Sequence, residues 1–221
     1  MKNMDVRYKN ILFDLDGTLT DSADGVTRSV QYALKKFGIE TTEEESKFFV
    51  GPPLSWSFEN NYGFSKTKAL QAVDYYREYY REKGIYENKL YPLVPEMLES
   101  LKRSGAKLFV ATSKPTIFAE KVLQHFNIDR YFITIAGSNL DGTRVEKSEV
   151  INFILKNNSA LDKKEAVMVG DRKHDIRGAR NCDLDSIAVT YGYGSITELT
   201  AAEPTHLIHS VPELTEFLLA M

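Results

Sequence analysis

Two aspartates stand directly after a short apolar run near the start of the chain, in Ile11-Leu12-Phe13-Asp14-Leu15-Asp16-Gly17-Thr18. An apolar run of this length, bounded by Asp and Gly, predicts a buried strand of a parallel sheet. Ligands of open α/β sheets bind beyond the carboxyl ends of such strands, which places Asp14 where chemistry occurs. Taken alone, the pattern also fits an acidic turn that only ends a strand.

Two later apolar runs, 108–111 and 166–169, also predict strands that end in polar residues. The polar residues that follow these strands or begin a helix are Thr112, Ser113, Lys147, Asp171 and Asp175. Asp14, Asp16, Asp171 and Asp175 would then converge, and four carboxylates repel one another unless a cation neutralises them. A set of oxygen ligands favours Mg²⁺. Thr112 and Lys147 add the donor and the positive charge that a phosphoryl group requires.

Each of these residues also has a purely structural interpretation. Thr112 fits a strand-to-helix cap, Lys147 a solvated helix start, and Asp175 a partner of the helix dipole. The order of the residues and their common position at strand ends favour the functional interpretation. Residues 113–115 and Thr18 stay open, because the backbone or side chains there fit a substrate contact and 113–115 equally fit a turn that starts a helix.

The order of the predicted elements indicates an α/β fold with a helical insertion. Helical patterns cover 22–37, 42–50, 54–62 and 65–83, including a capping-box signature at Thr42 and Glu45, and no strand interrupts them. From Pro92 onward, helices alternate with strands. Helices are expected at 96–103, from Pro115 to about 126, and at 148–156. Further strands are expected at 131–136, 186–189 and 206–208. We therefore predict a doubly wound, mostly parallel, Rossmann-like sheet in residues 1–20 and 91–221, with a small α-helical cap domain in residues 21–90.

Composition narrows the range of partners. The 221 residues carry 28 basic and 31 acidic side chains, for a net charge of −3, and no basic block, which argues against nucleic-acid binding. The single cysteine, Cys182, is interpreted as a packing residue. No signal pattern and no apolar stretch of roughly 20 residues is found, so we expect no membrane association and a cytoplasmic location. The expected partner is a small phosphorylated metabolite, and the expected state is a monomer or weak homo-oligomer.

These residues together resemble the haloacid dehalogenase-like superfamily of phosphatases, whose four motifs occur here in order across the whole chain. Phe13-Asp14-Leu15-Asp16-Gly17-Thr18-Leu19 resembles the first motif and Val110-Ala111-Thr112-Ser113 the second. Lys147 ahead of a helix resembles the third, and Val169-Gly170-Asp171 with Asp175 the fourth. The insertion after the first motif resembles the cap of the phosphoglycolate phosphatase-like group.

The resemblance implies a role for each motif residue. Asp14 would attack phosphorus to give an aspartyl phosphate, and Asp16 would move protons to the leaving oxygen and from the attacking water. The Asp14 carboxylate, the Asp16 main-chain carbonyl and Asp171 would hold Mg²⁺, while Asp175 would steady the metal shell and Lys147. The phosphate-binding residues would be Thr112, Ser113 and Lys147.

The substrate is less well defined than the reaction. Ala111–Pro115 and Gly170–Ile176 are similar to a 5′-nucleotidase-like branch, which favours nucleoside monophosphates, with phosphoglycolate phosphatase as the alternative. The aromatic residues of the insertion, which would either stack a base or pack helix on helix, are Trp56, Tyr75, Tyr76, Tyr79 and Tyr80. A phosphomutase and a non-enzymatic phosphoacceptor module remain as further alternatives, and dehalogenation fits the acidic set less well.

Overall fold

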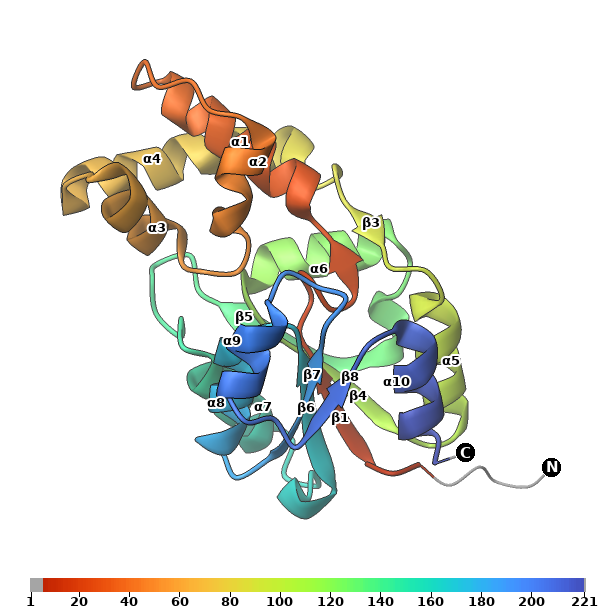
Figure 1. Ribbon diagram of the computed structural model, residues 1–221. Helices are drawn as coiled ribbons and strands as arrows, with labels where there is room; N and C mark the ends of the chain where they lie inside the picture. Colours follow the sequence, from red (N-terminus) through yellow and green to blue (C-terminus); the bar gives the residue numbers. More distant parts are fainter. Residues whose placement is uncertain (1–5, 221) are drawn as a thin grey trace. The chain divides into compact units, whose positions relative to one another are not determined.

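The computed structural model describes residues 6–220, which form two compact units (Figure 1). The larger unit contains the chain up to Thr20 and from Leu90 onward, and the helical unit spans Asp21–Lys89. The short strands β2 (Thr20–Asp21) and β3 (Lys89–Leu90) mark the two places where the chain crosses between the units. Among the described residues, no helix combines the length and apolar character needed to span a membrane.

The larger unit is built on one six-stranded sheet with the strand order β5-β4-β1-β6-β7-β8. Its strands are β1 (Asn10–Phe13), β4 (Lys107–Pro115), β5 (Phe132–Ser138), β6 (Ala166–Gly170), β7 (Asp185–Val189) and β8 (His206–Ile208). All neighbouring pairs are parallel. Phe13 at the end of β1 is in register with Val110 of β4 and Val169 of β6. The carboxyl ends of three central strands therefore lie at the same level.

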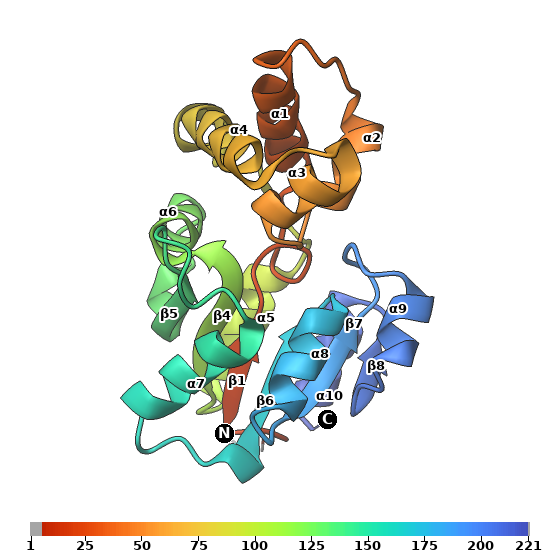
Figure 2. The ribbon, with the colours of Figure 1, turned by 90° about the vertical axis from the view of Figure 1, so that its left-hand side faces the viewer.

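Helices cover both faces of this sheet, as the doubly wound prediction requires. They are α5 (Val94–Arg103), α6 (Thr116–His125), α7 (Lys147–Asn157), α8 (Lys173–Arg180), α9 (Ile196–Ala201) and α10 (Val211–Leu218), with 3-10 turns at Asp129–Tyr131 and Lys163–Glu165. Figures 1 and 2 show α7 and α8 on one face and α5 and α10 on the other. Cys182 is buried in the core between the sheet and α7 and α8, so its interpretation as a packing residue is confirmed.

The helical unit contains α1 (Ala23–Lys35), α2 (Glu43–Ser46), α3 (Leu54–Tyr62) and α4 (Lys66–Tyr79), with a 3-10 turn at Lys47–Phe49 and a π-helical turn at Tyr80–Gly84. The predicted capping box is present, because the Thr42 hydroxyl accepts from Glu45 N and Thr42 N donates to Glu45 Oε2. A Cβ on Gly25 would lie 2.0 Å from the carbonyl oxygen of Gly84. The close approach of α1 to the π-helical turn therefore requires glycine at this position.

The structure confirms the expected sheet and decides between the two interpretations left open for residues 113–115. The predicted doubly wound, mostly parallel sheet is confirmed, and every neighbouring pair of its six strands is parallel. β4 continues through a register shift to Pro115, which pairs with Ser138, so residues 113–115 are not a helix-starting turn and α6 begins at Thr116. The Ser138 hydroxyl donates to the Ser113 carbonyl at 2.8 Å and helps to hold this extension on β5.

Leu12 lies in the centre of the sheet, and its side chain is completely buried in the core. We expect Leu12→Ala to lower the free energy of unfolding by about 2–5 kcal/mol, because it removes buried apolar contacts and leaves a cavity. Ile133→Ala in β5 is the matched control, since Ile133 is 56% exposed, and should cost less than about 1 kcal/mol. Equal losses for the two variants in denaturant unfolding would contradict this account of the core.

Candidate active site

Three buried carboxylates gather at the carboxyl ends of the central strands. Asp14 follows β1, Asp171 follows β6, and Asp175 lies in the first turn of α8. Each offers one oxygen such that these atoms lie within 4.8 Å of one another. Their exposed fractions are 8%, 0% and 1%. Such a dry cluster of negative charge and oxygen ligands suits a hard divalent cation.

Lys147 is the positive partner of this cluster. Its ammonium lies 2.7 Å from Asp175 Oδ1 and 3.1 Å from Asp14 Oδ1, and it donates to the carbonyl of Ala111 at 2.9 Å. The side chain is 2% exposed, so Lys147 is not the solvated helix start of the structural interpretation. A Cβ on Gly178 of α8 would lie 2.7 Å from Lys147 Cγ. Glycine at that position leaves the space through which the lysine stem passes.

The Asp16 side chain does not join the three-carboxylate cluster. Its Oδ2 lies 2.5 Å from the ammonium of Lys114, and the two side chains are 17% and 6% exposed. We predicted that four carboxylates converge at this site. Three of them do, whereas the fourth, Asp16, binds Lys114 at the extended end of β4. The ion pair separates Asp16 chemically from Asp14 although only one residue lies between them.

The end of β4 supplies the remaining polar groups of the site. Thr112 is buried, and its hydroxyl accepts from the backbone N–H of Lys114 at 3.2 Å. Ser113 is half-buried and contributes its main-chain carbonyl to the hydrogen bond with Ser138. Both residues therefore stabilise the irregular extension of β4 that carries Lys114 to Asp16.

The charge states follow from burial and from the ion pairs. Burial raises the pKa of Asp14 to about 6, although Lys147 opposes the shift, and burial raises the pKa of Asp171 well above its ordinary value. Burial by itself lowers the pKa of Lys147, but Asp14 and Asp175 outweigh it and raise the pKa to about 12. The Lys147 ammonium contacts Asp14 and Asp175 but cannot offset the charge of three ionised acids, so a cation would favour their ionised forms.

A loop after β7 completes the site, and it is absent from the sequence predictions. The backbone N–H of Tyr193 donates to Asp171 Oδ2 at 2.7 Å. Arg172, next to Asp171, pairs with Glu198 of α9 at 3.0 Å. The only signal in the sequence was the alternation of tyrosine and glycine in Tyr191-Gly192-Tyr193-Gly194, directly after a predicted strand.

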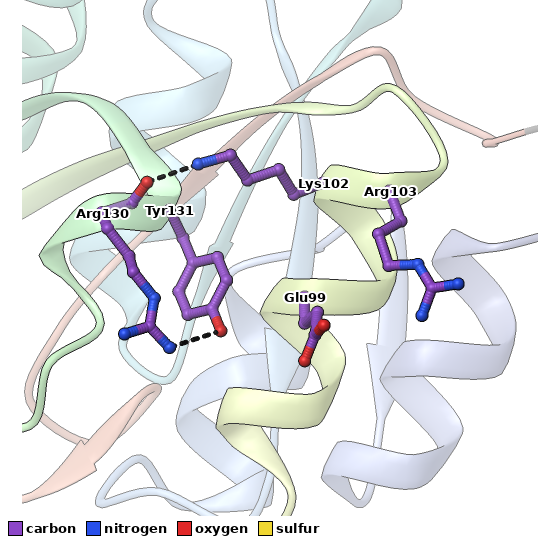
Figure 3. Close-up of a pocket in the computed structure, with 5 residues that line it drawn as sticks. All are labelled: Glu99, Lys102, Arg103, Arg130 and Tyr131. Atoms are coloured by element: carbon purple, nitrogen blue, oxygen red, sulfur yellow. Dashed lines mark hydrogen bonds between the residues drawn. The ribbon is translucent and has the colours of Figure 1, made fainter.

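A separate surface pocket is lined by Glu99, Lys102, Arg103, Arg130 and Tyr131 (Figure 3). The Lys102 ammonium donates to the Arg130 carbonyl and the Arg130 guanidinium to the Tyr131 hydroxyl, as the dashed lines show. These residues precede β4 and β5 and so lie at the amino ends of the strands. The pocket is therefore on the opposite edge of the sheet from the carboxylates, and two of its cations, Lys102 and Arg130, form hydrogen bonds within it.

A wholly parallel α/β sheet with paired acids after its central strand and a buried lysine nearby defines a class of enzymes that act on phosphate groups. The family profile described as "Haloacid dehalogenase-like hydrolase" matches residues 11–189. The chain belongs to this family and is a phosphatase, a hydrolase of phosphoric monoesters.

Several proteins of known name or structure are similar to this chain over most of its length. The chain is 46% identical to a 5′-nucleotidase from Pseudomonas aeruginosa over 219 residues, covering 99% of each. It is 36% identical to the tyrosine-protein kinase PtkA from Mycobacterium tuberculosis, covering 94% of this chain and 72% of that one, and 30% identical to a phosphoglycolate phosphatase from Vibrio vulnificus, covering 96% of each. Among solved structures, a predicted phosphatase from Clostridium acetobutylicum matches with a TM-score of 0.92 and 46% identity, covering 97% of this chain and 99% of that one.

The raised pKa of Asp14 predicts a pH dependence of stability. Relative to the unfolded chain, folding without metal favours the neutral carboxyl of Asp14. This contribution to stability is complete below the ordinary pKa of 3.8 and is lost as the pH rises through about 6. A cation requires the ionised form. We expect the metal-free Tm to fall between about pH 5 and about pH 7.5, and added Mg²⁺ to raise Tm more at the higher pH.

Asp14→Asn is the control for this measurement, because the amide cannot titrate. The difference in Tm between the two pH values should be smaller in this variant than in the unmodified chain. Parallel pH profiles of Tm for the two proteins, with and without Mg²⁺, would contradict the assignment of the titration to Asp14.

Proposed function

We propose that the chain is a Mg²⁺-dependent phosphatase that hydrolyses small phosphomonoesters, with nucleoside monophosphates as the preferred substrates, through an aspartyl-phosphate intermediate. The observation that carries the proposal is the contact of Asp14 with the buried ammonium of Lys147 beside Asp171 and Asp175. A nucleophile, a fixed positive charge and ligands for a cation are thereby present at one strand end.

The donor set fits Mg²⁺. The Asp14 and Asp171 carboxylates and the main-chain carbonyl of Asp16 would hold the ion. Asp175 is better suited to positioning, because its Oδ1 lies at the Lys147 ammonium and its Oδ2 accepts from the backbone N–H of Arg172 at 3.0 Å. When bound, Mg²⁺ offsets the negative charge of the carboxylates and polarises the phosphoryl oxygens.

The reaction has two displacement steps, formation and hydrolysis of the aspartyl phosphate, and Asp14 and Asp16 take part in both. Asp16 enters the reaction protonated, having given up its ion pair with Lys114. An oxygen of Asp14 attacks phosphorus, and the bond from phosphorus to the leaving oxygen breaks as Asp16 donates its proton to that oxygen. Asp16, now a carboxylate, takes a proton from the water that attacks the phosphorus of the aspartyl phosphate, which releases phosphate and restores Asp14. Lys147 and the hydroxyls of Thr112 and Ser113 stabilise the charge on the phosphoryl oxygens.

The 5′-nucleotidase from Pseudomonas aeruginosa supports nucleoside monophosphates as substrates, since the similarity spans both chains almost entirely. The phosphoglycolate phosphatase relative supports the alternative at lower identity. Tyr76 and Tyr80 are buried and stacked on each other with ring centroids 5.4 Å apart, so they pack the helical unit rather than bind a base. Trp56 is 53% exposed and remains available for stacking on a base.

Similarity to a tyrosine-protein kinase raises the question of where the phosphoryl group goes. A phosphoacceptor or a transferase would retain the phosphoryl group on Asp14 or pass it to another hydroxyl. The position of Asp16 favours water as the acceptor. A side chain that acts as acid and base two residues from the nucleophile promotes hydrolysis of the aspartyl phosphate. Stoichiometric release of inorganic phosphate, with no isomerised or phosphorylated product, distinguishes hydrolysis from a phosphomutase and from a kinase.

Two isosteric substitutions separate the roles of the aspartates. Asp14→Asn should reduce Mg²⁺-dependent hydrolysis of nucleoside monophosphates by at least about 10⁴-fold and weaken Mg²⁺ binding, because the amide is a poor nucleophile and carries no charge. Asp16→Asn should reduce kcat by about 10²–10⁴-fold while retaining Mg²⁺ and substrate binding. Phosphate release and calorimetric titration measure both. Full turnover in Asp14→Asn would refute the mechanism.

Substrate preference is tested with a panel of nucleoside monophosphates, phosphoglycolate, sugar phosphates and pyrophosphate. We expect kcat/KM to be highest for a nucleoside monophosphate, at least about 10-fold above phosphoglycolate, since this ratio reports differential binding of the transition state. A higher kcat/KM for phosphoglycolate would replace the nucleotide assignment while leaving the phosphatase assignment intact.

The same panel tests our proposal that residues 21–90 act as a cap domain that selects the leaving group. Replacing them with a short linker should leave a folded, Mg²⁺-binding protein with weak activity on small activated esters. It should lose the discrimination between nucleotides and phosphoglycolate. An unchanged substrate ranking in this variant would assign specificity to the larger unit.

A further inference from the structure

The loop between β7 and α9 packs on the turn after β1 and on Asp171, within the larger unit. We infer that Tyr191 of this loop is a positioning residue that fixes the Asp171 carboxylate for cation binding. The inference rests on the proposed function, since it takes Asp171 as a ligand of Mg²⁺. It concerns a segment outside the four motifs.

Both oxygens of Asp171 are held by groups that this loop controls. The Tyr193 backbone N–H donates to Oδ2 at 2.7 Å, and the Thr18 hydroxyl donates to Oδ1 at 3.4 Å. Tyr191 in turn donates its hydroxyl to the buried Thr18 carbonyl at 3.1 Å. The contacts form a closed ring that runs from Tyr191 through Thr18 and Asp171 back to Tyr193. Rotation of the carboxylate is therefore opposed from both sides.

Steric contacts fix the loop as firmly as the hydrogen bonds do. A Cβ on Gly192 would lie 2.3 Å from the Gly17 carbonyl oxygen and 2.4 Å from Asp171 Cβ. A Cβ on Gly194 would lie 2.0 Å from the Asp171 carbonyl oxygen. Neither glycine has a positive φ, so the requirement is for space rather than for an unusual backbone conformation. The loop backbone thus lies directly against the metal-site carboxylate.

The Tyr191 ring is itself braced. Its edge meets the ring of Tyr91 with centroids 5.0 Å apart and an interplanar angle of 68°. The backbone N–H of Tyr91 donates to the Leu19 carbonyl at 3.1 Å, which ties Tyr91 to the residue after Thr18. Tyr191 therefore contacts the two segments of the larger unit that lead into and out of the insertion. A phenylalanine would keep the ring contact and lose only the donor to Thr18.

Direct calorimetric titration of the full-length chain with Mg²⁺ tests the inference. We expect Tyr191→Phe to weaken Mg²⁺ binding by about 10-fold, the lower end of the loss found when an outer partner of a metal ligand is removed. At saturating Mg²⁺, kcat should recover to within about 2-fold of the unmodified value, because bound metal restores the carboxylate position. Gly192→Ala should weaken Mg²⁺ binding more than Tyr191→Phe does, since its Cβ overlaps Asp171.

Tyr8→Phe is the matched control. The Tyr8 hydroxyl donates to Asp185 Oδ2 at 2.7 Å at the amino end of β7, in the same unit but on the opposite edge of the sheet. This variant should lose stability in Tm and bind Mg²⁺ as the unmodified chain does. A merely structural role of Tyr191 predicts the same result for both tyrosines.

The outcomes separate the two claims. If the unmodified chain binds Mg²⁺ and Tyr191→Phe, shown to be folded, binds it equally well, the inference fails and the proposed function stands. The inference also fails if Tyr8→Phe weakens Mg²⁺ binding as much as Tyr191→Phe does. If the unmodified chain neither binds Mg²⁺ nor depends on it for hydrolysis, the proposed function and the inference fail together.

Discussion

The structure depends on the confinement of three carboxylates and one ammonium in a buried space at the end of β1. Like charges at this distance are tolerated only when hydrogen bonds, an opposite charge or a cation offset the repulsion and the loss of hydration. Lys147 supplies part of this compensation and backbone N–H groups supply more. The parallel register that brings β1, β4 and β6 to one level is the geometric condition for the arrangement.

Several glycines exist to permit this crowding. Gly17 has a φ of +84°, and a Cβ there would lie 2.2 Å from Asp171 Oδ2. A Cβ on Gly170 would lie 2.2 Å from Asp175 Cγ. Gly178 plays the same part beside Lys147. At each of these positions the missing side chain lets the backbone approach a charged side chain closely. Glycines are thus concentrated where the backbone must lie close to the buried acids and to Lys147.

Local patterns were sufficient for most of the helices and strands and for placing polar residues at the strand ends. The run before Asp14, the capping box at Thr42 and the placement of Lys147 at a helix start follow from spacing alone, because each depends on neighbours within a few residues. The ion pair of Asp16 with Lys114 and the loop at 191–194 could not be predicted in this way. Both join segments far apart in the chain, and their existence depends on the strand order and on the register shift that extends β4.

The hydrogen bond between Tyr91 N and Leu19 O bears on how independent the larger unit is of the inserted segment. It brings the exit and return of the 69-residue segment Asp21–Lys89 side by side, so that to the six-stranded sheet the segment is equivalent to a tight loop. Loops whose ends already meet accept insertions of very different size at little entropic cost. The length of this segment is therefore nearly independent of the six-stranded sheet, because the chain leaves and re-enters the larger unit at one place whatever lies between.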